Sequence, residues 1–185
     1  MTRRRPQPLR PSTGLVKWER KTPVRMADQW DEPQLLDMWQ QMHAEQPYHP
    51  SDISKVSAMF RLAIVPTDDR RGIIGVIGER HHLVAAIFLM LDPIWYSQDW
   101  HLIEYFNYVR PEARKSTYAR DLIAYGIECS ESIGIDLTMG VFSNIRTEAK
   151  CRLYDRQLER MGAFYRHVPT SKGRVAETKR EVMAA

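Results

Sequence analysis

The sequence has little cysteine and no long hydrophobic run. Its 185 residues include only two cysteines, Cys129 and Cys151, and neither stands in a C-x-x-C pair or at a metal-ligand spacing with histidine, which excludes a disulfide framework and a zinc ribbon. We expect both thiols to be reduced and structural, in helices. No apolar stretch approaches the roughly 20 residues that span a bilayer. No hydrophobic segment follows the basic start MTRRRPQPLRP, so we expect a cytoplasmic protein without an export signal.

Charge is unevenly spread along the chain. Residues 1–22 carry seven basic side chains against one acidic one, a balance of +6, so residues 23–185 carry −2 within the total of +4. This proline-containing N-terminal arm has too little apolar surface to fold alone. It is either a solvated tail or a segment that binds nucleic acid or an acidic protein surface. Residues 169–185 form a polar C-terminal tail, which leaves residues 23–168 as one domain.

Two helices are predicted after a short first strand at 24–27. Asp31 as N-cap, followed by a proline in the first turn, favours a helix start, and apolar residues at helical spacing continue the helix. Pro47 ends this helix. A second helix begins with Ser51 or Asp52 as its cap and carries apolar residues at the same spacing.

From residue 72 onward the pattern is that of short strands. Three apolar runs, 72–78, 83–91 and 101–109, are separated by turn residues, which predicts an antiparallel meander. The elements expected after it are a helix at 116–132 closed by Gly134, a strand at 135–142, a long helix at 144–161 and a strand at 163–168. The fold class is therefore mixed α/β, a sheet flanked by helices.

The segment YVRPEARKSTYARDLI, residues 108–123, joins the last strand of the meander to the next helix through a proline and a basic turn. The first turn of a helix has unpaired N–H groups and the positive end of the helix dipole, so an anion there meets several donors. Arg114 and Lys115 add full positive charges. The segment is either a phosphate-binding loop or an ordinary strand-to-helix connection with solvated basic residues.

This segment resembles the acetyl-CoA pyrophosphate loop of the GNAT N-acetyltransferase superfamily. The pattern there is V-x-P-E, then Arg or Gln, two residues, Gly, one residue, and Gly or Ala. Thr117 occupies the central glycine position, where a side chain limits the approach of a pyrophosphate to the backbone. The residues that match are Val109, Pro111, Glu112, Arg114 and Ala119. The order of elements over about 24–168 is also that of the GNAT fold, and the pattern is nearest to acetyltransferase-like proteins of tailed bacteriophages.

The resemblance implies a central, mostly antiparallel twisted sheet that splays between its fourth and fifth strands. It also implies transfer of an acetyl group from acetyl-CoA to a primary amine, by direct attack in a ternary complex and without a metal. The acceptor would be a small molecule, or a protein lysine or N-terminus. The residues it assigns to acetyl-CoA are Tyr108, Val109, Arg110, Arg114, Lys115, Ser116, Thr117, Tyr118, Ala119 and Asn144.

Two catalytic residues are expected. Glu104 is the only acidic residue of the run at 101–109; it is either a general base, with a pKa raised by burial, or a glutamate on the solvent face of the strand. His101 is the reserve base. The resemblance implies a tyrosine of the last helix as the acid that protonates the CoA thiolate. Leu158 stands at its usual position, and Tyr154, one turn earlier on the same face, is either that acid or a core aromatic.

The acceptor site and the role of the fold remain open between alternatives. The aromatic segment DPIWYSQDW, residues 92–100, lines an entrance for a cationic substrate or forms a protein interface. His81 and His82, in a predicted turn, are expected to be solvated rather than metal ligands. The first functional hypothesis is an acetyltransferase. The second is a non-catalytic assembly protein, a virion component if phage-encoded, that acts through its arm and aromatic segment, alone or as a homo-oligomer.

Overall fold

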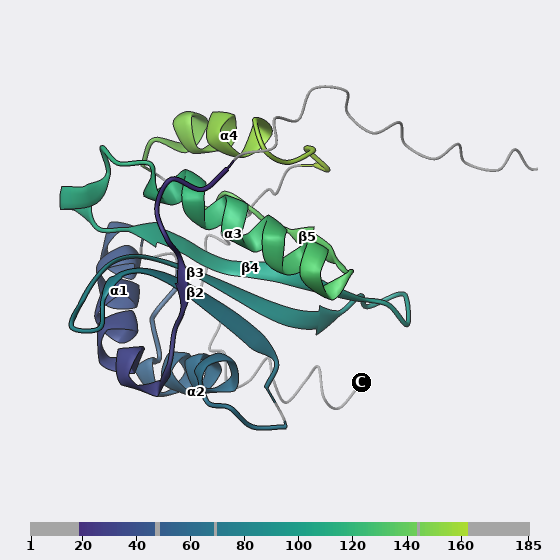
Figure 1. Cartoon of the computed structure of the whole chain (residues 1–185), viewed down its shortest axis with the longest axis horizontal. Helices are drawn as coiled ribbons and strands as arrows, with labels where there is room; N and C mark the ends of the chain where they lie inside the picture. Colours follow the sequence, from purple (N-terminus) through teal and green to yellow (C-terminus); the bar gives the residue numbers. More distant parts are fainter. Residues whose placement is uncertain (1–18, 47–48, 69, 144, 163–185) are drawn as a thin grey trace, which may run out of the picture.

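The computed structural model describes residues 19–46, 49–68, 70–143 and 145–162. Five strands form one sheet in the sequential order β1-β2-β3-β4-β5, with helices on both faces (Figure 1). Most of the N-terminal arm, the C-terminal tail and the strand expected at 163–168 lie outside the described residues. Within them, the elements follow one another in the predicted order.

The three long strands form the predicted antiparallel meander. They are β2 (Gly72–Glu79), β3 (His82–Pro93) and β4 (Trp100–Val109). A two-residue strand, β1 (Arg25–Met26), pairs antiparallel with β2 on its other edge. β3 is buried along most of its length, because helices cover both faces of the sheet.

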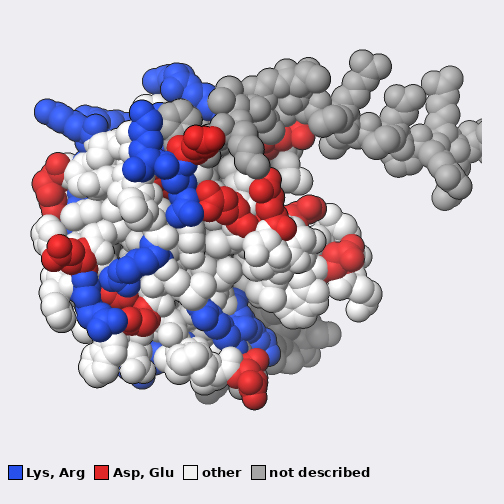
Figure 2. Space-filling view, in the orientation of Figure 1, with Lys and Arg blue, Asp and Glu red and all other residues white. Residues whose placement is uncertain are grey.

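The helices lie in two layers. α1 and α2 cover one face of the sheet, and α3 covers the other, with α4 above it in the view of Figure 1. The helix bounds are α1 Glu32–Glu45, α2 Ile53–Ile64, α3 Tyr118–Ile133 and α4 Thr147–Asp155. On the face seen in Figure 2, basic and acidic side chains are interspersed.

Each face of the sheet has its own hydrophobic core. Leu35 and Phe60, from α1 and α2, are buried against Phe88 of β3. Leu122 of α3 is buried on the other side, in a cluster with Ile87 of β3. Neighbouring residues of one strand point to opposite faces, so β3 contributes to both cores.

β4 contains a bulge opposite β3. Phe88 pairs with Phe106, but its next neighbour in β3 pairs with Glu104, so Tyr105 is an extra residue. A bulge changes the alternation of side chains along a strand, and the rings of Tyr105 and Phe106 both pack against Phe88, with centroids 5.4 and 6.1 Å away. Glu104 and Asn107 flank this aromatic pair and both reach α4 on the opposite side of the sheet.

The start of α1 differs from the prediction. A 3₁₀ turn, Gln29–Asp31, precedes the helix, and Asp28 caps that turn by accepting a hydrogen bond from Trp30 N at 2.9 Å. Asp31 makes no capping bond to α1. Its carboxylate is fully buried and binds the Arg25 guanidinium of β1 at 2.7 and 2.8 Å. A buried carboxylate needs such partners. The ion pair between Asp31 and Arg25 therefore joins the start of α1 to the first strand.

Two other helix boundaries are as predicted. Asp52 caps α2, since its carboxylate accepts a hydrogen bond from Lys55 N at 3.2 Å. Gly134 closes α3 in the left-handed conformation, with φ of 78°, and its N–H donates to Ser130 O at 2.8 Å. Glycine adopts this conformation without steric cost.

The last two described elements are shorter than predicted. β5 spans Asp136–Thr138, against a predicted strand at 135–142, because it pairs with β4 over only three residues. α4 spans Thr147–Asp155, against a predicted helix at 144–161. Leu158 N still donates to Tyr154 O at 2.9 Å, but the chain does not continue as a helix, so hydrophobic spacing overstated the length of α4.

Cys129 and Cys151 are free thiols, half-buried in α3 and α4. Burial raises the pKa of the Cys129 thiol, which disfavours its reactive thiolate form. Among the helices of the described residues, none is long and apolar enough to cross a membrane.

Candidate active site

The sheet opens between β4 and β5, as predicted. The two strands run parallel and pair only where His101, Leu102 and Ile103 lie opposite β5. From Glu104 to Val109, β4 is paired with β3 on one edge, and no strand of the described chain pairs with its other edge. The unpaired edge of a strand carries backbone N–H and C=O groups that an extended ligand can bind.

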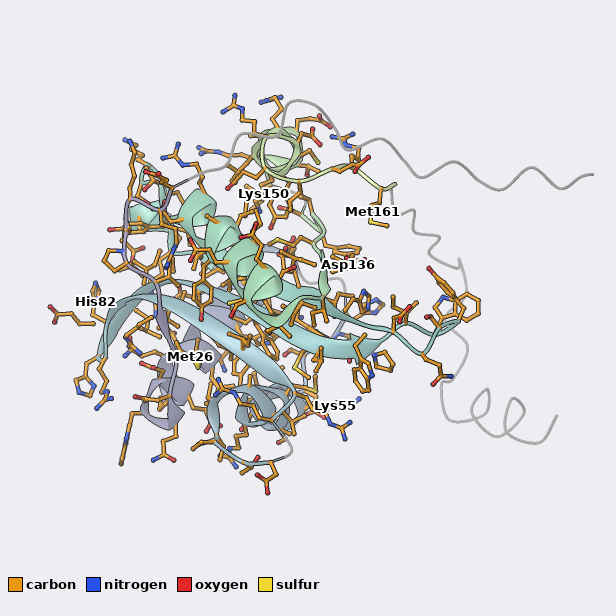
Figure 3. The ribbon with its side chains drawn as sticks, turned by 45° about the vertical axis from the view of Figure 1, so that its right-hand side comes forward. Met26, Lys55, His82, Asp136, Lys150 and Met161 are labelled. Carbon is orange, nitrogen blue, oxygen red and sulfur yellow. The ribbon has the colours of Figure 1, made fainter. Side chains whose placement is uncertain are left out.

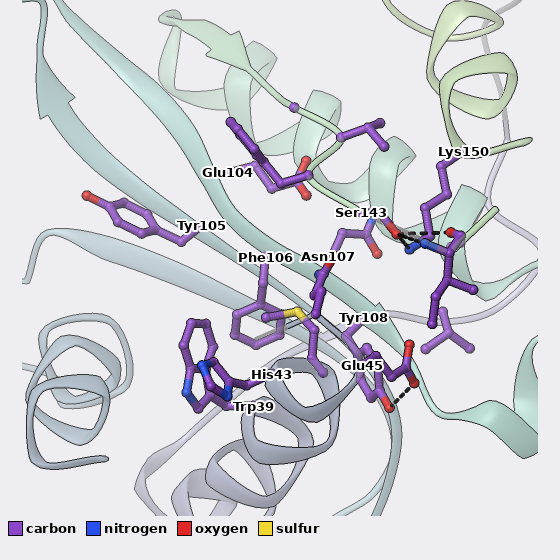
Figure 4. A pocket seen from close by; sticks show the side chains of 18 of the residues that line it. Trp39, His43, Glu45, Glu104, Tyr105, Phe106, Asn107, Tyr108, Ser143 and Lys150 are labelled. Carbon is purple, nitrogen blue, oxygen red and sulfur yellow. Dashed lines mark hydrogen bonds between the residues drawn. The ribbon is translucent and has the colours of Figure 1, made fainter. Parts of the chain in front are cut away.

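A cavity of about 780 Å³ lies at this opening. Residues of α1, α2, β4, the start of α3, 140–143, 145–146 and α4 line it, and Figure 4 shows part of them. The predicted site residues that line it are Glu104, Tyr108, Val109, Arg114, Ser116, Ala119 and Tyr154. The predicted residues that do not are Arg110, Lys115, Thr117 and Tyr118. Asn144 lies outside the described residues.

Glu104 and Tyr154, the two predicted catalytic residues, are in direct contact. The Tyr154 hydroxyl lies 3.0 and 2.9 Å from the two carboxylate oxygens of Glu104, to which it donates. Asn107 Nδ2 donates in turn to the Tyr154 hydroxyl at 3.3 Å. Tyr154 therefore lies in the cavity, one helical turn before Leu158, and α4 ends before Leu158.

The Glu104 carboxyl has an unusually high pKa. Burial raises the pKa of this carboxyl from 4.5 to about 8, against the opposing effects of the Tyr154 hydroxyl, a hydrogen bond from Gly140 and the charge of Lys150. A carboxylate loses water contacts at this depth, which disfavours its charged form. Burial and the adjacent carboxylate raise the pKa of Tyr154 well above 10. At neutral pH the pair therefore consists of a neutral phenol and a carboxyl that can gain or lose a proton.

Arg114 also lines the cavity and is engaged by α1. Its Nη2 contacts the carboxylate of Glu45 in the last turn of that helix, and its Nε donates to Val109 O at 3.1 Å. Its guanidinium also lies 5.5 Å from the centre of the Tyr108 ring. The Tyr108 hydroxyl donates to the same Glu45 carboxylate at 3.2 Å. Glu45 is thus an internal anion beside the arginine predicted to hold a phosphate.

Arg110 joins neighbouring elements of the fold. Its guanidinium binds Asp37 of α1 at 2.7 Å and donates to Leu83 O at 2.7 Å, and its backbone N–H donates to Val84 O at 2.9 Å. These contacts engage both its side chain and its main-chain donor. They join the end of β4 to α1 and β3.

Thr117 turns its hydroxyl toward its own helix. Thr117 Oγ1 donates to Asp121 Oδ2 at 2.6 Å, and Asp121 is fully buried. The other carboxylate oxygen of Asp121 accepts from Lys21 N at 3.1 Å, and Arg20 pairs with Glu128 of α3 at 2.7 Å. The Thr117 side chain is therefore held by α3 and does not line the cavity. Arg20 and Lys21, near the end of the arm, contact the same helix.

Lys150 and Asn107 line the cavity, and neither was predicted. Lys150 Nζ donates to Ser143 Oγ at 2.6 Å, and burial lowers the pKa of its ammonium. Asn107 Oδ1 is buried without a hydrogen-bond partner, and such a group is costly unless a ligand satisfies it. The spacing of four residues between Lys150 and Tyr154 is the sequence signal that would have pointed to a shared helix face.

Another wall of the cavity comes from α1, α2 and the β4 bulge. Trp39, His43 and Tyr105 line the cavity there, and Trp39 Nε1 donates to Ser51 Oγ at 2.8 Å. His43 Nε2 lies 2.6 Å from His49 O. Aromatic faces favour a cation, and Trp39 and Tyr105 supply two such faces on this wall.

The aromatic segment at 92–100 lies away from the cavity. Trp95 and Tyr96 are 92% and 75% exposed in the connection between β3 and β4, and their rings meet edge to face at 5.2 Å. Neither lines the cavity, so this segment belongs to the surface rather than to the core.

The histidines named from the sequence also lie outside the cavity. His101 Nδ1 lies 3.3 Å from Thr138 Oγ1, in the paired part of β4 and β5, and it does not line the cavity. His81 and His82 are exposed where β2 turns into β3. In the part of the chain that the structure describes, no group of three or more His, Cys, Asp or Glu could hold a metal ion.

Comparison with solved structures identifies the fold. A possible acetyltransferase from Clostridium difficile 630 superposes with a TM-score of 0.60 at 17% identity, covering 80% of this chain and 97% of the other. A ribosomal-protein-alanine N-acetyltransferase from Brucella melitensis gives 0.58 at 12% identity, covering 80% and 99%. An aminoglycoside acetyltransferase from an uncultured soil sample gives 0.56 at 11% identity, covering 80% and 96%.

The chain therefore has the GNAT fold, a five-stranded mixed sheet flanked by helices in which β4 and β5 are parallel. No family model matches the sequence, and no curated protein matches it significantly. Because the identities lie between 11 and 17%, the likeness concerns the fold, and the chemistry must be argued from the site.

Proposed function

We propose that this protein is an N-acetyltransferase that moves an acetyl group from acetyl-CoA to a primary amine by direct attack in a ternary complex. The observation that carries this proposal is the position of Glu104: a carboxyl with a pKa of about 8, inside a cavity, at the point where β4 and β5 part. A proton acceptor with a pKa near the working pH is what an amine nucleophile requires.

The cavity offers groups that fit acetyl-CoA along its length. Arg114, Ser116 and the start of α3 would bind the pyrophosphate, since a cation and a helix N-terminus both favour an anion. The unpaired edge of β4 at Tyr108 and Val109 would bind the pantetheine arm through its backbone. Asn107 Oδ1, which is buried and has no hydrogen-bond partner, would accept a hydrogen bond from the ligand in the same cavity. When bound, acetyl-CoA supplies the thioester whose acyl group is transferred.

Glu104 would accept the proton that the attacking ammonium has to lose. The pKa of about 8 leaves about a tenth of the carboxyl ionised at pH 7 and most of it above pH 8. A free N–H of the β4 edge would stabilise the negative charge that develops on the carbonyl oxygen.

Tyr154 would act as a hydrogen-bond donor rather than as the source of the final proton. The pKa of its phenol is raised well above 10, whereas a thiol has a pKa near about 8.5, so transfer of the phenolic proton to a thiolate is uphill. The Glu104 carboxyl, once it has received the proton of the amine, is the better acid. Tyr154 would orient Glu104 and hold its own proton throughout.

The acceptor would approach from the wall formed by α1, α2 and the β4 bulge. Trp39 and Tyr105 provide aromatic faces there, which suits a cationic amine. Two of the solved neighbours are named for aminoglycosides and for a ribosomal-protein alanine, so a small polyamine and a protein N-terminus are the first acceptors to test.

The non-catalytic assembly protein remains the second candidate. Two observations favour it: Arg114 is already paired with Glu45, and Trp95 and Tyr96 expose a large aromatic surface. Exposed aromatic patches of this kind occur at protein interfaces. In that case the cavity would bind acetyl-CoA weakly or not at all. A place in a virion belongs to this alternative, and the resemblance to tailed-bacteriophage proteins stays a prediction.

A thermal-unfolding titration of the full chain with acetyl-CoA separates the two. Ligand at 100 times its Kd stabilises a protein by about 2.7 kcal/mol, which raises the Tm of a chain of this size by about 5 to 10 °C. We expect a saturable rise that Arg114→Ala weakens. Lys115→Ala, at the exposed neighbouring position outside the cavity, is the matched control and should behave like the wild type. No shift at millimolar acetyl-CoA would favour the assembly protein.

A further inference from the structure

Lys150 is a primary amine inside the cavity. It lies on α4, one turn before Tyr154, and both side chains line the cavity. Its Nζ donates to Ser143 Oγ at 2.6 Å (Figure 4). Side chains four residues apart share one face of a helix, so the amine lies on the face of α4 that also brings the Tyr154 hydroxyl to Glu104.

Charged groups from both parts of the site act on Lys150. They are Glu45 and Arg114 on one hand and Glu104 on the other. Arg114 marks the end proposed for the pyrophosphate and Glu104 the end proposed for the thioester. The flexible four-carbon stem of a lysine lets its amine move by several ångströms, so Nζ can reach along this channel toward the acyl group.

Lys150 is also prepared chemically to act as a nucleophile. Burial lowers the pKa of its ammonium, and the charge of Arg114 lowers it further, while the carboxylates of Glu45 and Glu104 oppose this effect. A lower pKa leaves more of the neutral amine at a given pH, and only the neutral amine attacks a carbonyl. The Ser143 hydroxyl accepts a hydrogen bond from Nζ, which orients the nitrogen.

We propose that Lys150 is a self-acetylation site, at which bound acetyl-CoA acetylates the protein when no acceptor amine is present; this rests on the acetyl-CoA binding proposed above. The nitrogen lone pair attacks the acetyl carbonyl carbon, a C–N bond forms, and the C–S bond breaks. The sulfur leaves as a thiolate. The proton lost from the nitrogen passes to Glu104 and from there to the sulfur, so the products are an amide at Lys150 and free CoA.

The cavity provides its own control. Lys55 also lines it, but it comes from α2, and in Figure 3 it lies across the sheet from Lys150. Both amines would meet the same concentration of acetyl-CoA in solution. Lys150 shares α4 with Tyr154, whose hydroxyl contacts Glu104, and Lys55 does not. A difference between the two lysines therefore measures the effect of bound acetyl-CoA.

The test is to incubate the full chain with acetyl-CoA without any acceptor and to follow the intact mass and the acetylated peptides over time. We expect one acetyl group per chain, mapped to Lys150, at a rate that does not depend on protein concentration. Lys150→Arg should lose it and leave Lys55 unchanged. Arg114→Ala should slow it about tenfold, as expected when a charged hydrogen bond to the ligand is lost.

Three results would overturn self-acetylation at Lys150. The first is acetylation of Lys150 no faster than that of Lys55, or no faster in the folded chain than in the heat-unfolded chain. The second is the absence of acetylation although acetyl-CoA raises the Tm, which would leave the proposed acetyltransferase standing and reject this site. Absence of both acetylation and a Tm shift would reject the acetyl-CoA site together with this one.

Discussion

Replacing Glu104 by glutamine should have opposite effects on activity and on stability. Glutamine keeps the size of the side chain and its ability to accept a hydrogen bond from Tyr154, but it cannot take up a proton. A positioned general base contributes about 10² to 10⁴ in rate. We therefore expect Glu104→Gln to lower kcat/KM by about that factor with any acceptor that the wild type uses.

The stability effect follows from the direction of the pKa shift. The pKa of the carboxyl is 4.5 when unfolded and about 8 when folded, so between these values the folded state binds more protons than the unfolded state. Stability from this group is therefore complete below pH 4.5 and is lost as the pH rises through about 8. The difference corresponds to at most about 5 kcal/mol at 1.36 kcal/mol per pH unit. Solvent in the cavity screens the charge, so we expect about 2 kcal/mol.

Glu104→Gln should thus melt about 4 to 8 °C above the wild type at pH 9 and close to it at pH 5. Thermal unfolding at the two pH values and initial rates of thiol release from pH 6 to 9 check both effects. The wild-type rate should rise through an apparent pKa near 8, and this rise should be absent in the variant. Glu131→Gln, at an exposed position on α3, is the control. A variant that melts lower than the wild type at pH 9, or keeps the rise in rate, would refute the assignment.

Two further substitutions test contacts that hold the site and the fold. Glu45→Gln removes the internal anion beside Arg114, so acetyl-CoA no longer competes with that anion for the guanidinium. The Kd for acetyl-CoA, measured by calorimetry, should fall about 3- to 10-fold. An unchanged or higher Kd would contradict this role of Glu45. Asp31→Ala leaves the Arg25 guanidinium without its buried partner. The free energy of unfolding, measured in urea, should fall by about 2 to 4 kcal/mol. A loss below about 0.5 kcal/mol would show that this ion pair does not stabilise the contact between α1 and β1.

Much of the fold could be predicted because it rests on local signals. The meander follows from three apolar runs with turn residues between them, and Asp52 and Gly134 mark helix ends through bonds to residues three or four positions away. Asp31 misled the prediction because a carboxylate before a helix is usually a cap, and its true partner, Arg25, is identified only by the packing of β1 against α1.

The candidate site was predictable only in part. Glu104 stood out as the acidic residue of an apolar strand, but its side of the sheet depends on the extra residue Tyr105, which strict alternation cannot reveal. The pair of Glu45 and Arg114 joins residues 69 positions apart, and Lys150 enters the cavity because α4 lies over the opening of the sheet. Such contacts are set by how helices pack, which a single sequence does not specify.

The buried carboxylate of Asp121 has a consequence for shortened forms of this protein. It accepts hydrogen bonds from the Thr117 hydroxyl and from the backbone of Lys21, so one residue of α3 joins the turn after β4 to the chain before β1. A chain that begins at Val24 would keep all five strands. It would lack the backbone N–H of Lys21, which donates to the buried Asp121 carboxylate, and a lost donor to a buried charge is costly. The shortest chain that keeps this hydrogen bond therefore begins at Lys21 or earlier, ahead of the first strand.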